Sequence, residues 1–191
     1  ADPRRGPSVV FDLGVGSLLL GADPRAAETA ALTETLAGEM RKAGAPLGIG
    51  RYDEARLLYV SPLFGAGEAP TAERRTIHLG IDLFVAPGST VKAPLPGVVH
   101  TLANNASPQD YGPLVILRHQ TDEGLPFFTL YGHLSEDTLS GLAVGQGVDA
   151  GQPIGRVGSP PTNGDWPPHV HFQLILDLLD QGRDFPGVAR A

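Results

Sequence analysis

The amino-acid sequence predicts a mainly β protein: an antiparallel β-sheet or sandwich with a duplicated hairpin motif, preceded by a small strand–helix–strand segment. Two observations carry this prediction. The 191 residues include 25 glycines and 18 prolines, where average usage would give roughly 23 in total, and these residues separate short apolar runs. Helical spacing of apolar residues occurs in one stretch near the N-terminus. Many short strands joined by turns are typical of a compact antiparallel β domain.

The N-terminal part predicts one helix between two strands. Asp23 is a typical N-cap residue, and Pro24 suits the first helical position. The Ala/Leu/Glu-rich stretch that follows has helical spacing as far as Lys42, and Gly44 ends it. Extended runs flank the helix and a Gly/Ala/Pro-rich linker follows them; these three segments are residues 8–20, 51–60 and 65–71.

From Arg74 onward, apolar runs alternate with Gly and Pro, and helical spacing is lost. Six runs predict strands, namely 77–85, 91–102, 113–119, 126–134, 142–157 and 169–179. Residues 86–99 and 142–155 share the form Gly-x-x-Val-x-Ala, a turn feeding a strand, which indicates a duplicated hairpin. We therefore expect three parts, which are an N-terminal segment with its linker (1–70), a β domain (71–181) and a C-terminal tail (182–191).

Composition and charge argue against several classes of partner. The net charge is −7 without any Lys/Arg cluster, whereas nucleic-acid binders show a basic stripe. No apolar run approaches the roughly 20 residues of a membrane span, and the start lacks the features of a secretory signal. We therefore expect neither a nucleic-acid nor a membrane partner. Because the sequence opens at Ala1, we expect a mature secreted product or an excised domain, and the compartment stays open.

Metal chemistry in this chain must use histidine and carboxylate ligands, because there is no cysteine. His169 and His171 begin an extended run, and residues i and i+2 of a strand share a face roughly 6.5–7 Å apart. One of them could bind a metal while the other acts beside it. The alternative for such a motif in isolation is two ordinary strand histidines.

Two further histidines, His78 and His133, favour a metal-binding or catalytic role over ordinary strand histidines. His78 and Asp82 would lie about 13 Å apart on a straight strand, so a shared metal requires a turn, which Gly80 favours. His133 ends an apolar run beside Gly132, a residue that lets backbone or substrate approach closely. Catalytic zinc sites typically use three His, Asp or Glu ligands and keep one position for water, while nearby histidines move protons.

In this order, the H-x-x-x-D, Tyr-x-His-Leu and H-x-H-Phe motifs resemble the lysostaphin-type (LytM-like) zinc metallopeptidases. The stretch Leu79 to Leu83 and the two Val-x-Ala hairpins support the resemblance, which covers about residues 74–176. It implies a lysostaphin-like peptidase fold and hydrolysis of a peptide or amide bond in a peptide or small amide substrate. The residues it implies are the Zn²⁺ ligands His78, Asp82 and His171 and the catalytic histidines His133 and His169.

The chain departs from the family pattern before the H-x-H strand. A short Gly/Ser/Thr-rich turn is usual there, whereas residues 157–168 form a longer, bulkier segment that contains Trp166. We expect this segment, with Trp166, to border the substrate groove. Tyr131 and Asn104 are weaker candidates for the same groove, and the alternative for Tyr131, which we favour, is a tyrosine packed within its strand. Asn104 and Asn105 are also predicted to form a turn.

A narrower resemblance concerns the setting of the domain. The segments 50–59, 76–84 and 166–177 are similar to the middle region of fused proteins, in which a peptidase-like domain lies between a kinase-like phosphotransferase and a class III aminotransferase. This would make the chain an excised, cytoplasmic domain; otherwise we expect a periplasmic or secreted protein. The alternative function is a non-catalytic, zinc-retaining binding or regulatory domain of a larger biosynthetic protein. A biotinyl-type carrier is disfavoured because Lys92 lies within a run rather than at a hairpin tip.

Overall fold

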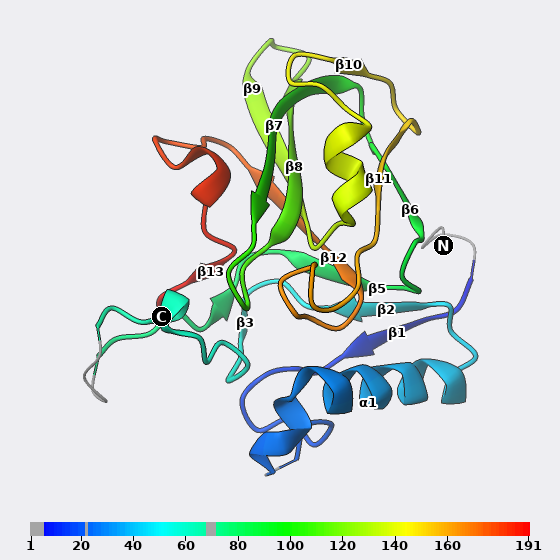
Figure 1. Cartoon of the computed structure of the whole chain (residues 1–191), viewed down its shortest axis with the longest axis vertical. Coiled ribbons are helices and arrows are strands. Elements are labelled where there is room, and N and C mark those ends of the chain that lie inside the picture. The colour runs from blue at the N-terminus through cyan, green and yellow to red at the C-terminus, as the bar shows by residue number, and fades with distance from the viewer. Residues whose placement is uncertain (1–5, 22, 68–71) are drawn as a thin grey trace. The chain divides into compact units, whose positions relative to one another are not determined.

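The computed structural model describes residues 6–21, 23–67 and 72–191, which belong to two compact units (Figure 1). The first unit contains residues 1–85 and 186–191, and the second contains residues 86–185. The predicted domain limits at 70/71 and 181/182 stay predictions. Among the described residues, no helix combines the length and the apolar character that a membrane crossing requires.

The first unit is built on a strand–helix–strand arrangement, as predicted. β1 (Ser8–Phe11) and β2 (Leu47–Gly50) pair in parallel, which requires a crossover, and α1 (Thr29–Lys42) supplies it. β5 (Ile81–Phe84) pairs with β2 in the antiparallel sense. The predicted second strand was misplaced, because pairing with β1 selects residues 47–50 instead of 51–60.

The predicted helix is interrupted after its first turn. Asp23 caps a 3₁₀ turn, η1 (Pro24–Ala27), by accepting the Arg25 N–H (3.0 Å). Glu28 then has an extended backbone (ψ 141°), so α1 begins only at Thr29. The predicted end is confirmed, since α1 stops at Lys42 and Gly44 has a φ of +60°.

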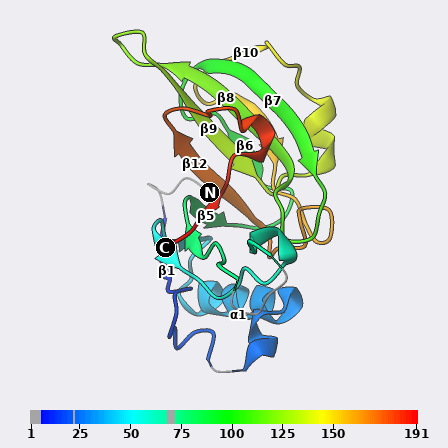
Figure 2. The same ribbon diagram turned by 90° about the vertical axis from the view of Figure 1, so that its left-hand side faces the viewer.

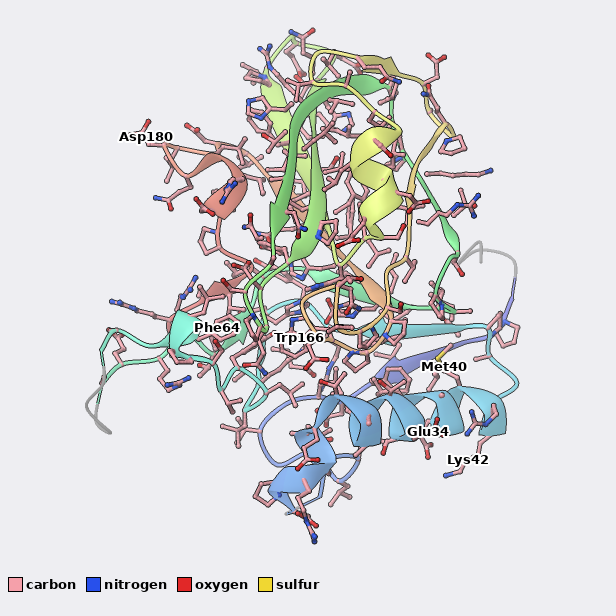
Figure 3. All side chains as sticks on the ribbon, viewed as in Figure 1. Glu34, Met40, Lys42, Phe64, Trp166 and Asp180 are labelled. Atoms are coloured by element: carbon pink, nitrogen blue, oxygen red, sulfur yellow. The ribbon has the colours of Figure 1, made fainter. Side chains whose placement is uncertain are left out.

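Packing of α1 on β1 and β2 explains the apolar pattern of this segment. The helix buries Leu32 and Leu36, and Figure 3 shows Met40 on the side of α1 that faces β1. A Cβ at Gly48 would lie 2.3 Å from the Phe11 ring and 3.2 Å from the Met40 sulfur. Glycine in β2 therefore lets the Phe11 ring lie across the strand.

A second, three-stranded sheet completes the first unit. It contains β3 (Glu54–Ala55), β4 (Ile77–His78) and β13 (Val188–Ala189), in the order β13-β4-β3. Asp53, with φ 53°, turns the chain into β3. Beyond β3 the ladder ends, and the short 3₁₀ turn η2 (Pro62–Phe64) follows. The predicted strand over Leu57 to Val60 was therefore wrong, and the predicted linker at 65–71 lies partly outside the described residues.

The second unit contains an antiparallel sheet in the order β12-β9-β8-β7-β10, which confirms the predicted mainly β architecture. Figure 2 shows the pronounced curvature of β7 and β8. Its strands are β7 (Gly97–Asn105), β8 (Gly112–Gln120), β9 (Pro126–Gly132), β10 (Gly147–Val148) and β12 (His169–Ile175). Two 3₁₀ turns accompany them, η3 (Glu136–Ser140) and η4 (Gly182–Asp184). The core includes Leu114, Ile116 and Leu130, which are fully buried.

The two predicted repeats pair with each other instead of each forming its own hairpin. β6 (Thr90–Lys92) of the first repeat pairs with β11 (Pro153–Arg156) of the second. In return, β10 of the second repeat pairs with β7, which continues the first repeat. Each repeat therefore contributes a strand that pairs with the other repeat, and backbone N–H and C=O groups of one repeat bind those of the other.

A buried hydrogen-bonded chain crosses β8 and β9 in the second unit. Nδ1 of His119 donates to the carbonyl of Pro96 (2.8 Å), and Nε2 is hydrogen-bonded to the Thr129 hydroxyl oxygen (2.7 Å). The Thr129 oxygen is also bonded to the Tyr131 hydroxyl (3.0 Å). Burial raises the pKa of Tyr131 to about 12, although the bond to Thr129 opposes this shift. The phenol is therefore neutral at physiological pH.

Replacing Thr129 by valine is expected to lower the free energy of unfolding by about 1–3 kcal/mol, because His119 and Tyr131 both lose a buried partner. Urea denaturation measures this change. The matched control is Thr101→Val, whose hydroxyl bonds the exposed His100 (2.8 Å); we expect a change within about 0.5 kcal/mol there. Equal losses in the two variants would contradict a stabilising role for the buried chain.

Candidate metal centre

His78 and Asp82 lie on either side of a bend in the chain. β4 ends at His78, the backbone bends at Gly80, and β5 begins at Ile81. β4 pairs with β3 and β13 whereas β5 pairs with β2, so the bend carries the chain from one sheet to another. Nε2 of His78 consequently lies 3.2 Å from Oδ1 of Asp82. The predicted turn between the two residues is confirmed.

Neighbouring groups fix the orientation of this pair. Nδ1 of His78 lies 2.8 Å from the Arg51 carbonyl oxygen; a carbonyl only accepts, so Nδ1 carries the proton and a neutral ring has its lone pair on Nε2. Oδ2 of Asp82 accepts from Nη1 of Arg56 at 2.6 Å. Two electron-pair donors therefore face each other at 3.2 Å. Such an arrangement is stable when a cation or a ring proton lies beside both.

Arg56 is a buried, permanent cation next to Asp82. Burial alone would lower the pKa of the guanidinium, but the carboxylates of Asp82 and Glu54 raise it well above its usual range. The side chain of Arg56 also donates from Nε to Oε2 of Glu54 (2.8 Å). Asp82 is thus held as a carboxylate by charge and by a direct hydrogen bond.

The H-x-H motif lies at the start of β12, and its histidines share one face of the strand with Gln173, as alternation predicts. All three side chains are buried. Nε2 of His171 is bonded to the side-chain oxygen of Gln173 (3.1 Å), which leaves the lone pair on Nδ1. Nδ1 of His169 donates to the Pro167 carbonyl (2.6 Å), which leaves the lone pair on Nε2.

His133 follows β9 in a left-handed backbone conformation with φ 62°, which is uncommon for a residue with a Cβ and typical of functional sites. Its Nδ1 donates to the Asn163 carbonyl (2.9 Å), so its lone pair is also on Nε2. The ring centroid lies 4.4 Å from that of His169 and 6.2 Å from that of His171. The structure therefore brings together the three predicted histidines of the second unit.

Tyr111 packs against these histidines. Its ring lies 5.4 Å from His171 and 6.0 Å from His133, centroid to centroid, and its hydroxyl donates to the Phe185 carbonyl (3.1 Å). A Cβ at Gly132 would lie 2.5 Å from this ring. Glycine beside His133 therefore makes room for a tyrosine ring, where the sequence suggested close approach of backbone or substrate.

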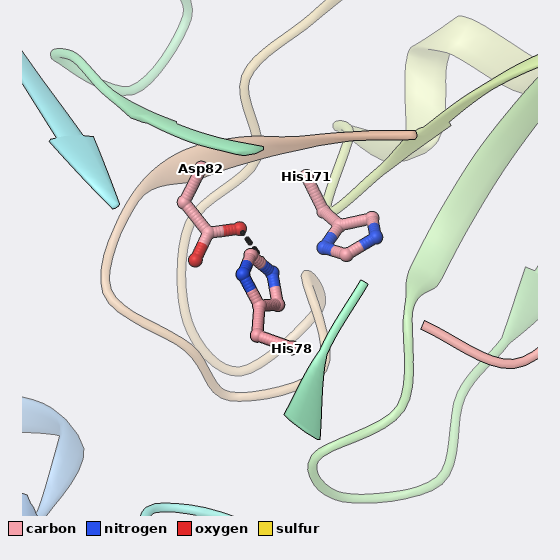
Figure 4. Close-up of side chains that lie close together, drawn as sticks. All are labelled: His78, Asp82 and His171. Atoms are coloured by element: carbon pink, nitrogen blue, oxygen red, sulfur yellow. Dashed lines mark ion pairs between the residues drawn. The ribbon is translucent and has the colours of Figure 1, made fainter. Parts of the chain in front are cut away.

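His78, Asp82 and His171 form a compact group of metal-ligating side chains (Figure 4). Each offers one ligand atom, and these atoms all lie within 4.8 Å of one another. Tetrahedral zinc with bonds of about 2.0–2.2 Å places its ligand atoms roughly 3.3–3.6 Å apart, so the more distant atoms of this group would move closer together around one ion. Two imidazoles and one carboxylate, all buried, are a donor set that fits catalytic zinc.

Asn163 closes the turn that carries Trp166. Its side chain donates from Nδ2 to the Trp166 carbonyl (2.9 Å) and accepts the Trp166 N–H (3.3 Å). Asn163 is completely buried, and its carbonyl is the acceptor for His133. The long segment before β12 therefore orients a catalytic-type histidine and holds Trp166 edge-on to it, with centroids 6.2 Å apart.

Replacing Gly164 by alanine is expected to displace this turn. Gly164 has φ +84°, and its Cβ would lie 2.0 Å from the Asp110 carbonyl oxygen. Gly145→Ala is the matched control, because Gly145 has φ +86° and open space around the added Cβ. The control carries only the strain of positive φ, about 1–3 kcal/mol. Gly164→Ala should lose clearly more in thermal or urea unfolding; equal losses would contradict the tight packing.

The three residues predicted to border a substrate groove lie in different settings. Trp166 is half-buried beside His133, Tyr131 is buried and bonded to Thr129, and Asn104 is exposed on β7. The predicted turn at 104–105 was wrong, because both residues pair with β8. Their roles toward a substrate stay predictions.

Sequence reasoning missed four residues of this region, namely Arg56, Tyr111, Asn163 and Gln173. Gln173 alone had a local signal, because it follows His171 by two positions on the same strand face. Arg56 and Asn163 act through contacts 26 and 30 residues away along the chain. No local pattern reveals such contacts.

Two imidazoles and a carboxylate form a group that could hold a metal ion, and two further histidines lie beside His171, the kind of donor set that zinc metallopeptidases use. Residues 76–182 match the model of peptidase family M23. The matched region is more than half of the chain, and the chain belongs to this family.

Several known proteins are similar to the chain. It is 33% identical over 131 residues to an uncharacterized metalloprotease of Haemophilus influenzae, covering 68% of this chain and 25% of that protein. It is 34% identical over 116 residues to the L-Ala–D-Glu endopeptidase of Bacillus subtilis, covering 58% of this chain and 33% of that protein. The solved catalytic domain of lysostaphin from Staphylococcus simulans is 30% identical to this chain, with a TM-score of 0.44. The match covers 62% of this chain and 83% of that domain. The match thus spans a quarter of the Haemophilus influenzae protein and a third of the Bacillus subtilis endopeptidase.

Proposed function

We propose that this chain is a zinc-dependent endopeptidase or amidase that hydrolyses a peptide or amide bond. In this proposal His78, Asp82 and His171 are the zinc ligands, and His133 and His169 are the catalytic histidines. The observation that carries the proposal is the pair of potential metal ligands, Nε2 of His78 and Oδ1 of Asp82, held 3.2 Å apart. Membership of family M23 supports the same assignment.

Zinc would supply a Lewis acid for the scissile carbonyl and lower the pKa of a bound water to about 7. The two catalytic histidines would handle protons and charge. Because carbonyl groups hold the Nδ1–H of both His133 and His169, each ring acts through Nε2. A neutral ring accepts a proton there, and a protonated ring donates a hydrogen bond to the developing oxyanion. Rings with centroids 4.4 Å apart are close enough to act on one scissile bond.

Two kinds of peptide are the first substrates to test. One relative is named for cleavage of the L-Ala–D-Glu bond, which suggests stem peptides that contain this bond. The lysostaphin-type resemblance implies glycine-rich peptides as the second kind. We propose that the segment before β12 selects between them, since Trp166 lies 6.2 Å from His133.

Metal analysis combined with peptide cleavage tests the proposed function. We expect about one zinc per purified chain and cleavage of at least one peptide class, detected by mass spectrometry and abolished by a chelator. Added zinc should restore the cleavage. A chain that neither holds nor regains zinc would overturn the proposal. Full zinc occupancy without cleavage of any peptide would instead support the non-catalytic binding or regulatory alternative.

A finer proposal concerns the protein to which the domain belongs. The resemblance to fused proteins leads us to propose flanking kinase-like and aminotransferase domains, a cytoplasmic location and a small amide substrate. The full-length gene product tests this directly. A product that instead carries an export signal would favour a periplasmic or secreted peptidase acting on peptides.

A further inference from the structure

Arg56 lies behind the proposed zinc ligand Asp82, in the first unit. It donates from Nη1 to Oδ2 of Asp82 (2.6 Å), from Nε to Oε2 of Glu54 (2.8 Å), and from Nη2 to the Arg51 carbonyl (3.2 Å). Arg56 is 3% exposed, Asp82 2% and Glu54 6%. Every nitrogen of the guanidinium therefore has an acceptor, and the planar group holds the carboxylate in one orientation.

The hydrogen bonds around Arg56 also include His78, the second proposed zinc ligand of the first unit. The Arg51 carbonyl that accepts from Arg56 also accepts from Nδ1 of His78. Glu54 is held in turn, because its Oε1 accepts from the Leu13 N–H (3.1 Å) and from Nε of Arg51 (2.7 Å). One turn of the chain, residues 51–56, thus supports both His78 and Asp82.

We propose that Arg56 is a positioning residue of the metal centre, which orients the Asp82 carboxylate with Oδ1 toward zinc. This inference rests on the proposed zinc site. The guanidinium binds Oδ2, and this orientation places Oδ1 3.2 Å from Nε2 of His78. Arg56, Glu54 and Arg51 all precede the matched residues 76–182. The N-terminal segment is therefore a working part of the metal centre.

Charge compensation explains why a cation can lie so close to a metal ligand. The buried group contains the cation Arg56 and the anions Asp82 and Glu54, and Arg51 adds a second cation at the surface. Glu54 supplies the negative charge that Arg56 needs while Asp82 is shared with the ion. Residues that hydrogen-bond to a metal ligand without binding the metal themselves typically contribute about 10–100-fold to metal affinity.

The test compares three variants of the full 191-residue chain with a control. Arg56→Met removes the positioning group. Arg56→Met combined with Glu54→Gln removes one charge of each sign, so Glu54 is not left as a buried carboxylate without Arg56, and the net charge is kept. Arg56→Lys keeps the charge without the planar two-point geometry. The control is Arg74→Met, because Arg74 is exposed and its guanidinium donates to the backbone carbonyls of Tyr59 and Ser61.

Zinc affinity is measured by competition with a chelator, and the visible spectrum of the cobalt(II)-loaded protein reports ligand geometry. Thermal unfolding in excess chelator measures the stability of the metal-free chain separately. We expect zinc affinity to fall about 10–100-fold in the methionine and double variants, with an altered cobalt spectrum. Lysine should restore part of the affinity, and the control should match wild type.

The outcomes separate this inference from the proposed function. If the wild-type chain binds no zinc, the proposed function itself fails. If wild type binds zinc but a folded Arg56 variant matches it within about twofold, with an unchanged cobalt spectrum, then Arg56 serves stability alone and this inference is overturned. Reduced affinity in the folded double variant supports it, because loss of folding cannot then explain the change.

Discussion

Alanine at His78 or at His171 is expected to abolish zinc binding in practice, with affinity falling more than about 100-fold. The expected loss exceeds the roughly 10–100-fold effect of residues that only hydrogen-bond to a metal ligand, because here a direct ligand is removed. His78 is held for this role by the Arg51 carbonyl, and His171 by Gln173, which leave one ring nitrogen of each for the metal. Metal content after dialysis and chelator competition measure the loss.

His100→Ala is the matched control for both ligand variants. His100 is exposed; its ring is hydrogen-bonded to the neighbouring Thr101 side chain and lies edge-on to Phe128, with centroids 5.2 Å apart. Its zinc content should equal that of wild type. Retention of one tightly held zinc by both His78→Ala and His171→Ala would rule out the proposed ligand set.

Alanine at His133 is expected to leave zinc bound while turnover falls by about 10²–10⁴-fold, the usual contribution of a positioned general acid or base. The ring is held by the Asn163 carbonyl, so its removal should lower the turnover number more than it changes KM. His169→Ala should behave in the same way. Steady-state kinetics on a cleaved peptide, with metal content measured in parallel, provide the comparison.

The double variant of His133 and His169 adds a sharper criterion. Two groups that act as one unit are non-additive, so the double variant should lose little more activity than the worse single variant. Full multiplication of the two single losses would show that the histidines act independently. Loss of zinc from His133→Ala would assign that residue to metal binding instead of proton transfer.

Local patterns predicted the elements of the fold wherever one short segment decides its own structure. Asp23, Pro24 and Gly44 placed the ends of the helical region, because caps and breakers act on adjacent backbone groups. The interruption at Glu28 and the position of β2 were missed. The latter depends on pairing with β1, a strand that lies far away in the sequence.

The candidate site shows the same division. The family motifs identified the histidines and Asp82, and strand alternation put His169 and His171 on one face. The backbone of His133, with φ 62°, follows no strand rule, because contacts of the segment around Asn163 hold it. The space beside Gly132 was predicted to admit backbone or substrate, whereas the Tyr111 ring fills it.

The sequence by itself determined the family, the mainly β architecture and the histidine and carboxylate groups available for zinc. Residue types, their order and their spacing of two or four positions are sufficient for these conclusions. Only the tertiary structure decided which ring nitrogen of each histidine carries its proton and which oxygen of Asp82 remains for a metal. The physical reason is that the choices at His78, His133 and Asp82 depend on the Arg51 carbonyl, the Asn163 carbonyl and Arg56, groups 26 to 30 residues distant in the chain, while folding of β12 sets the local partners of His169 and His171.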